Sequence, residues 1–213
     1  MLEEWKKRWL EDRIGWHEEQ GNASLKTHWT PPDKASSVLV PFCGKAKDLL
    51  WLASLGHRVI GIEISEIAAI AFFNENDLIF KEKLYKNIKL FEAEDIAISI
   101  YCEDYFNCNL PKADALYDRG SLVVVHPEKR FNYVQHTKSL LHKDAYRFII
   151  TLEYEEGFVQ GPPYSITPGE MLDYWSDLIQ IESYNDIENS SPKFKKSGLN
   201  EVLETIWVSH SKI

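Results

Sequence analysis

The spacing of apolar and polar residues changes several times along the first part of the chain. Residues 38–42 form a short apolar run rich in β-branched side chains, which predicts a buried strand. Residues 48–55 carry apolar side chains at helical spacing, and Gly56 follows as a helix stop. A second apolar run at residues 58–64 predicts another strand. This succession of strand, turn, helix and strand is typical of a parallel sheet with right-handed crossovers.

The rest of the chain continues this alternation of strands and helices. Ser65 is placed to cap a helix that extends through Phe73, and Pro127 opens a helix through about residue 141. Residues 167–170 read Thr-Pro-Gly-Glu, the capping-box pattern that begins a further helix. Additional strands are expected at residues 88–93, 97–102, 113–117, 147–154, 179–184 and 202–208.

The last two apolar runs differ from the earlier ones because only a hydrophilic loop, residues 185–200, separates them. Two strands joined in this way suit an antiparallel pair at the edge of a sheet. We therefore predict an α/β fold with an open, doubly wound, mostly parallel sheet of about seven strands and an antiparallel C-terminal edge. Ligands of such sheets bind beyond the carboxyl ends of the strands.

The overall composition narrows the classes of partner. The chain has 213 residues, of which 44% are hydrophobic and 27% charged, as expected for a single globular domain. Its 33 acidic residues outnumber its 24 basic residues, and the net charge of −9 argues against binding to nucleic acids or anionic membranes. We find neither a signal peptide nor an apolar stretch long enough to span a membrane. Nothing in this acidic chain requires a dimer, so we expect a monomer.

The cysteines and histidines form no recognised metal or redox motif. Cys43, Cys102 and Cys108 are irregularly spaced without a C-x-x-C pair, and free thiols suit a reducing compartment, which predicts a cytoplasmic location. The seven histidines form neither H-x-H nor H-E-x-x-H, so no metal site is predicted. Serine-hydrolase and P-loop motifs are also missing from the sequence.

Two positions at the ends of the first two predicted strands favour a nucleoside ligand. Gly44 lies in the turn after the first strand and would let the backbone approach a ligand, although one glycine fits a plain tight turn equally well. Glu63 ends the second strand nineteen residues later. An acid there can accept hydrogen bonds from both ribose hydroxyls and would repel the 2′-phosphate of NADP. Taken alone, Glu63 could equally be a surface residue, but the pair favours a nucleoside.

Two further features could belong to the same site. Residues 3–12 predict a short amphipathic helix with Trp5 and Trp9 on one face. Such a helix is most often simply packed on its domain; the functional alternative is a lid, residues 1–32, whose aromatic faces attract a sulfonium cation. Arg119 follows the strand at 113–117 and could hold an anion or an adenine edge, or pair with Asp118 or another neighbour.

Together these segments resemble the thiopurine S-methyltransferase family, especially its bacterial members. The resemblance extends from Trp5 to Val208. Its most specific part joins the turn Pro41-Phe42-Cys43-Gly44-Lys45 to WLASLGHRVIGIEISEI at residues 51–67. The other matching stretches are Trp5-x3-Trp9, Ile14-Gly15-Trp16-His17, Val38-Leu39-Val40 before the turn, YDRGSLV at residues 117–123, ITLEY at residues 150–154 and GPPY at residues 161–164.

This resemblance implies a class I, Rossmann-like methyltransferase domain over residues 1–213 that uses S-adenosyl-L-methionine. By motif, Trp5 and Trp9 would cover the cofactor, and Phe42 and Gly44 would line its binding site. Glu63 would hold the ribose hydroxyls. The remaining cofactor contacts would come from Asp104 and Tyr105 against the adenine, and from Arg119 beside both cofactor and acceptor.

The acceptor site is implied with some departures from the family pattern. Trp16 stands where the family often has Phe and would flank the acceptor, and Lys193 corresponds loosely to a basic residue that is often Arg. Lysine would lose the bidentate recognition of an anion that arginine provides. Phe42 replaces the usual Leu, which predicts a narrower cofactor site.

The implied reaction is an in-line displacement in which a soft nucleophile attacks the sulfonium methyl. The acceptor would be a thiol or thione, such as a thiopurine or an aryl thiol, or a selenium or tellurium compound. A free thiol has a pKa near 8.5, so thiolate is available without a dedicated base. Arg119 would position the acceptor, either by favouring an anionic acceptor or by polarising an ordered water, without being essential. Two alternatives stay open: an NAD-linked oxidoreductase, which should show a three-glycine loop, and a nucleoside-binding module without turnover.

Overall fold

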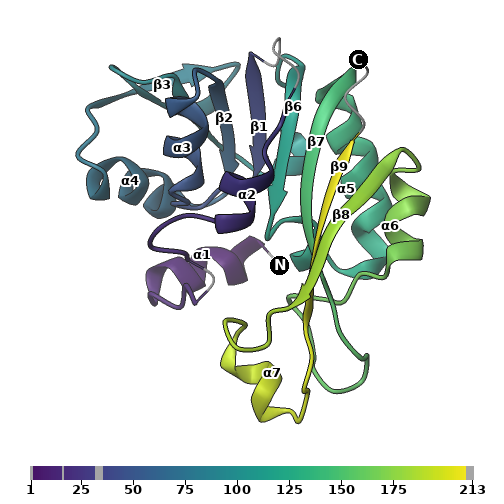
Figure 1. Ribbon diagram of the computed structural model, residues 1–213. Helices are drawn as coiled ribbons and strands as arrows, with labels where there is room; N and C mark the ends of the chain where they lie inside the picture. Colours follow the sequence, from purple (N-terminus) through teal and green to yellow (C-terminus); the bar gives the residue numbers. More distant parts are fainter. Residues whose placement is uncertain (1, 16, 32–35, 210–213) are drawn as a thin grey trace.

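The computed structural model describes residues 2–15, 17–31 and 36–209, and a single mixed β-sheet forms its centre (Figure 1). The strand order is β3-β4-β5-β2-β1-β6-β7-β9-β8. Neighbours from β5 to β7 are parallel, whereas both edges of the sheet are antiparallel. The strands are β1 (Ser37–Pro41), β2 (Arg58–Glu63), β3 (Phe80–Tyr85), β4 (Ile88–Ala93), β5 (Ile98–Cys102), β6 (Ala113–Arg119), β7 (Leu141–Glu153), β8 (Leu178–Asn185) and β9 (Leu203–Ser209).

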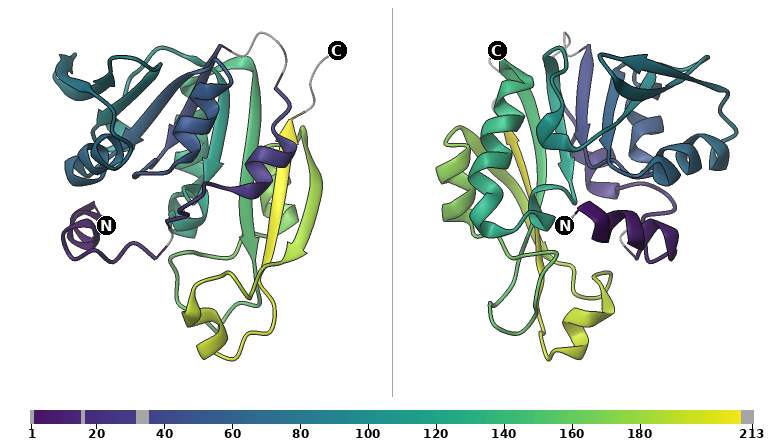
Figure 2. Two further views of the ribbon diagram at one scale, coloured as in Figure 1. Left: turned by 60° about the vertical axis from the view of Figure 1, so that its left-hand side comes forward. Right: turned by 180° about the vertical axis from the view of Figure 1, so that it is seen from behind.

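Helices cover both faces of the sheet, as Figure 2 shows from two further directions. On one face α2 (Ala23–His28), α3 (Asp48–Ser54) and α4 (Glu66–Glu75) share a hydrophobic core with Val38 and Val40. On the opposite face α5 (Pro127–Ser139) and α6 (Pro168–Tyr174) share a core with Leu39. Because successive residues of a strand point to opposite faces, β1 must be apolar throughout, which explains its continuous hydrophobic run.

Shorter elements lie beyond the sheet. Helix α1 (Leu2–Leu10) lies below the carboxyl ends of the parallel strands, and α7 (Pro192–Lys196) lies in the loop between β8 and β9 (Figure 1). Two short 3-10 turns, η1 (Tyr105–Asn107) and η2 (Leu122–Val124), follow β5 and β6. Among the described residues, no helix combines the length and apolar character needed to cross a membrane.

The predicted α/β architecture is confirmed, including the antiparallel pair of β8 and β9 at the C-terminal edge. The expected number of strands was too low, because the sheet has nine strands within the described residues. Strand β3 was not predicted: it lies at the opposite edge, and its sequence FKEKLY is exposed at the four central positions. Strand β7 also begins earlier than predicted, at Leu141, because the helix before it already ends at Ser139.

The capping box predicted at Thr167 is present only in its first half. The Thr167 side chain accepts a hydrogen bond from the backbone N–H of Glu170 at 3.2 Å. The carboxylate of Glu170, however, pairs with Arg130 of α5, whose Nη1 lies 2.8 Å from each carboxylate oxygen. Arg130 is only 1% exposed and its Nη2 also donates to the carbonyl oxygen of Ser165. The first turn of α6 is thereby fastened to α5.

Replacing Thr167 with alanine is expected to lower the free energy of unfolding by about 1 kcal/mol, the usual cost of losing an N-cap. Thr167 is exposed, so little else should change. Urea denaturation followed by far-UV circular dichroism measures the difference. Serine at this position keeps the capping oxygen and should restore most of the loss; equal losses for alanine and serine would contradict the capping role.

Candidate active site

A cavity of about 650 Å³ opens at the carboxyl ends of the central strands, beside α1. It lies where the strand order reverses between β1 and β6, the usual ligand position in open α/β sheets. Every residue that the sequence predicted to contact the cofactor lines this cavity. These residues are Trp5, Trp9, Phe42, Gly44, Glu63, Asp104, Tyr105 and Arg119.

Glu63 is a fixed, buried acid in the cavity wall. Its side chain sits at the end of β2 and the residue is only 4% exposed. One carboxylate oxygen accepts a hydrogen bond from the backbone N–H of Gly44 at 2.9 Å, and the other accepts from the N–H of Ser65 at 2.8 Å. Burial raises the pKa of Glu63, and these two N–H groups partly oppose that shift. Since each carboxylate oxygen can accept two hydrogen bonds, the group keeps acceptor capacity for a ligand.

The turn after β1 has an unusual backbone. Phe42 and Gly44 both have positive φ angles, +45° and +52°. For phenylalanine this conformation is costly, and such strain is common at functional sites. A Cβ on Gly44 would lie 3.0 Å from Cζ2 of Trp9, so glycine is needed here for the backbone angle and for the approach of α1. The Phe42 ring packs edge-on against Tyr105 with 5.3 Å between ring centroids.

The segment after β5 forms the next part of the wall. Asp104 is the N-cap of the η1 turn, and its carboxylate accepts a hydrogen bond from the N–H of Phe106. Tyr105 is buried, its hydroxyl lies 2.8 Å from Oγ1 of Thr137, and its ring stacks on Tyr133. The position of Tyr105 is therefore held by α5 from behind.

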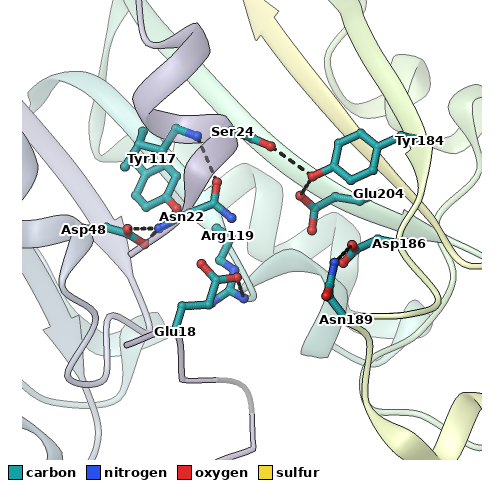
Figure 3. Close-up of polar contacts among 11 residues, drawn as sticks. Glu18, Asn22, Ser24, Asp48, Tyr117, Arg119, Tyr184, Asp186, Asn189 and Glu204 are labelled. Atoms are coloured by element: carbon teal, nitrogen blue, oxygen red, sulfur yellow. Dashed lines mark hydrogen bonds and ion pairs between the residues drawn. The ribbon is translucent and has the colours of Figure 1, made fainter. Parts of the chain in front are cut away.

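Arg119, at the end of β6, forms an ion pair with Glu18 of the N-terminal segment (Figure 3). Asp118, the nearest candidate partner, points elsewhere: its carboxylate accepts hydrogen bonds from the Tyr133 hydroxyl at 2.7 Å and the N–H of Leu122 at 3.1 Å. Because Asp118 is buried, its pKa is raised. Arg119 thus pairs with a residue that is its neighbour in space but lies 101 positions away in sequence.

Three acidic residues that the sequence reasoning missed, Glu18, Asp48 and Glu204, line the same part of the cavity. Asp48 accepts hydrogen bonds from the N–H of Asn22 at 2.6 Å and from the Tyr117 hydroxyl at 2.9 Å. Glu204 accepts from the Tyr184 hydroxyl at 2.6 Å.

A sequence signal existed for only one of these acids. Glu18 directly follows the matching stretch Ile14-Gly15-Trp16-His17 and could have been included with it. Asp48 looks like an ordinary first-turn residue of α3, and Glu204 looks like one polar position in an edge strand. The placement of Glu204 in the cavity depends on the strand order, which single-sequence patterns do not give.

The two predicted acceptor residues have different outcomes. Trp16 lies outside the described residues. Lys193 does not line the cavity: its ammonium group donates to the carbonyl oxygens of Gln160 and Pro162. Because Pro162 is part of the cavity wall, Lys193 supports that wall from outside.

Comparison with known proteins decides which family this site belongs to. The family model described as Thiopurine S-methyltransferase matches residues 1–212. The chain belongs to the thiopurine S-methyltransferase family. The thiopurine S-methyltransferase of Bos taurus is 32% identical over 221 residues, covering 99% of this chain and 90% of its own. That of Pseudomonas putida is 33% identical over 210 residues, covering 95% of this chain and 96% of its own.

Solved structures give the same fold. A Burkholderia thailandensis 1,6-didemethyltoxoflavin-N1-methyltransferase, crystallised with S-adenosylhomocysteine, superimposes with a TM-score of 0.62 at 16% identity, covering 99% of this chain and 87% of that one. TehB from Haemophilus influenzae gives a TM-score of 0.56 at 18% identity, covering 88% and 60%. Membership of the thiopurine S-methyltransferase family makes this chain an S-adenosylmethionine-dependent methyltransferase acting on a small molecule. The predicted cofactor is confirmed, and the NAD-linked alternative is set aside.

Proposed function

We propose that the chain transfers the methyl group to the sulfur of a small thiol or thione, thiopurine-like or aryl, or to an analogous selenium or tellurium compound. When bound, the cofactor supplies an electrophilic methyl group on a sulfonium centre. The observation that carries this proposal is the composition of the cavity, which is polar over β2 and β5 and largely apolar around η2 and over β7. The apolar wall consists of Val123, Val124, Val125, Ile150, Leu152, Pro162 and Pro163.

The polar half fits S-adenosylmethionine. The fixed Glu63 carboxylate suits a ribose diol, because both groups of such a diol donate hydrogen bonds. Tyr105 offers an aromatic wall for adenine, with Asp104 beside it. The cavity volume of about 650 Å³ lies in the range of sites that enclose small ligands, so cofactor and acceptor can share it.

The apolar half suits a flat, weakly polar acceptor. Such walls exclude water, and water exclusion favours a displacement in which the positive charge of the sulfonium disappears. Alignment of the acceptor sulfur then matters more than a strong base, because part of any thiol is already ionised near neutral pH. In this proposal Arg119 positions the acceptor, Trp16 flanks it, and Lys193 acts through the loop at Pro162.

We further propose a single methyltransferase domain, residues 1–213, with residues 1–32 as a lid. Support comes from α1, which lies across the carboxyl ends of the strands (Figure 1), and from Trp5 and Trp9, which line the cavity. Asp12, just after α1, has a positive φ of +51°, which turns the chain sharply there. We also propose that the protein is a monomer and has no nucleic-acid partner.

The proposed function is tested by binding and by turnover. Isothermal calorimetry should detect binding of S-adenosylmethionine and of its demethylated product S-adenosylhomocysteine. A methyl-transfer assay should then give methylated product with mercaptopurine, thiophenol or benzeneselenol. Binding of the cofactor without transfer to any member of a broad thiol, thione and selenol panel would instead favour the nucleoside-binding module.

The Trp9 ring is expected to contribute through the positive charge of the cofactor. Replacing Trp9 with leucine should raise the dissociation constant of S-adenosylmethionine by about 2- to 30-fold, the range of a cation–π contact. The affinity for the product S-adenosylhomocysteine, whose sulfur is uncharged, should fall less, so the product serves as the control ligand for this variant. Equal losses for both ligands, measured by calorimetry, would show that Trp9 acts only by packing on Gly44.

A further inference from the structure

At one end of the acceptor half of the cavity, around Arg119, acidic side chains outnumber basic ones. Glu18, Asp48 and Glu204 line it together with Arg119. Figure 3 shows Glu18 meeting Arg119, with Asp48 and Glu204 on either side of that pair. All three acids interact electrostatically with Arg119. Three carboxylates facing one guanidinium leave this region with a net negative charge.

The Glu18–Arg119 pair also determines what Arg119 offers to a ligand. A lone arginine at the end of β6 would attract an acceptor that carries a carboxylate. Here Glu18, a carboxylate of the chain itself, already binds the guanidinium. Burial raises the pKa of Glu18 and of Glu204, and Glu204 is only 8% exposed. An incoming anion would have to displace one of these acids or lie beside them.

We propose that Glu18 is a specificity-determining residue that selects acceptors whose body, away from the reacting sulfur, carries no negative charge. This inference rests on the proposed transfer to thiols and thiones and names their charge class. A thiolate charge on the reacting atom itself is not affected, because that atom would take the methyl group from the positively charged sulfonium. The remainder of the acceptor extends toward Arg119 at the end of β6, around which Glu18 of the N-terminal segment, Asp48 of α3 and Glu204 of β9 lie.

The physical basis is repulsion combined with the loss of an existing pair. Juxtaposing like charges at a binding surface costs several kcal/mol, and specificity often depends on such repulsive elements. Separating the pair would also leave a partly buried carboxylate without its cation, which is unfavourable. A neutral amide or ring nitrogen meets neither penalty, since it can donate a hydrogen bond to Glu18 or Glu204.

A matched pair of acceptors tests this inference directly. Para-mercaptobenzamide and para-mercaptobenzoate have nearly the same shape and differ in the charge opposite the thiol. The wild-type kcat/KM should favour the benzamide by roughly tenfold or more. In Glu18→Gln this preference should shrink by about tenfold, mainly through better use of the benzoate. Glu19→Gln removes the same charge from the exposed neighbouring position and should leave the preference unchanged.

Binding measurements separate this inference from the proposed function. Calorimetry of both compounds against the complex with S-adenosylhomocysteine should give the same preference and the same loss in Glu18→Gln. If neither thiol is methylated but this binding preference is found, thiol transfer is wrong and the charge selection stands. Equal use or equal binding by the wild type, no detectable binding of either compound, or an unchanged preference in Glu18→Gln would each overturn the inference.

A second variant tests the inference in case Glu18→Gln is misfolded. If Glu18→Gln melts far below the wild type, Glu204→Gln removes a charge from another wall of the same region. It must shift the preference toward the benzoate as well. A shift in the opposite direction, or none, counts against the inference.

Discussion

Replacing Glu63 with glutamine is expected to raise the dissociation constant of S-adenosylmethionine by about 10- to 150-fold, equivalent to about 1.5–3 kcal/mol for hydrogen bonds to a charged group. The amide keeps the size of the side chain but has one acceptor oxygen instead of two. Its NH₂ group would face either the N–H of Gly44 or that of Ser65, which now donate to the carboxylate. The variant therefore loses both the proposed ribose contact and part of the support of the turn.

Calorimetry with the wild type and Glu63→Gln measures this loss, and Glu66→Gln is a matched control. Glu66 lies three positions further on, is exposed and pairs with Lys89, so the same change there should leave the cofactor affinity unaltered. An unaltered dissociation constant in Glu63→Gln would exclude the proposed ribose contact.

The pH dependence of the same binding gives an independent check. Because burial raises the pKa of Glu63, this carboxyl takes up its proton at a higher pH than an ordinary glutamate. The ionised form accepts the hydrogen bonds, so cofactor affinity should fall as the pH is lowered from neutral into the mildly acidic range. Since glutamine does not titrate, the difference between wild type and variant should shrink over this range.

The largest loss of stability is expected from Arg130→Met, with the free energy of unfolding falling by about 3–5 kcal/mol, as when one partner of a buried ion pair is removed. Methionine fills a similar volume, so a cavity contributes little. The carbonyl oxygen of Ser165 loses its donor, and Glu170 loses its cation at the start of α6. Chemical denaturation measures the loss.

The double variant Arg130→Met with Glu170→Gln separates the two causes. It no longer has the unpaired carboxylate and should be more stable than Arg130→Met alone, in line with the behaviour of buried pairs replaced together. A double variant that is even less stable would show that Glu170 acts mainly through Tyr174, whose hydroxyl donates to it at 2.9 Å.

The parts of the fold that the sequence predicted are those where burial dictates composition. Strands β1, β2, β4 and β6 are buried at most positions and read as apolar runs. Strand β3 is an edge strand with Lys81, Glu82 and Lys83 in succession. Such charges protect an edge from pairing with other chains, but they leave no apolar run from which the strand could be predicted. Helices α2 and α7 have only six and five residues, too few for a helical period to be visible.

The residues of the candidate site were likewise predicted only in part. The residues at the ends of β1, β2 and β6 were predicted because turn position and strand order along the chain bring Gly44, Glu63 and Arg119 to one edge. Glu204 was not, because it reaches the cavity only through the insertion of β9 beside β7. The partner of Arg119 was also missed, since Glu18 comes from the segment before the first strand of the sheet.

Strand β9 is made after β8 but lies between β8 and β7. While the chain emerges from the ribosome, β8 therefore has no native neighbour in the sheet until β9 has followed it. The residues proposed to hold the cofactor lie between Trp5 and Arg119 and are synthesised well before that moment. Maturation should thus proceed in two stages, with an early nucleoside-binding half and a late step, the insertion of β9 with Glu204, that completes the half facing the acceptor.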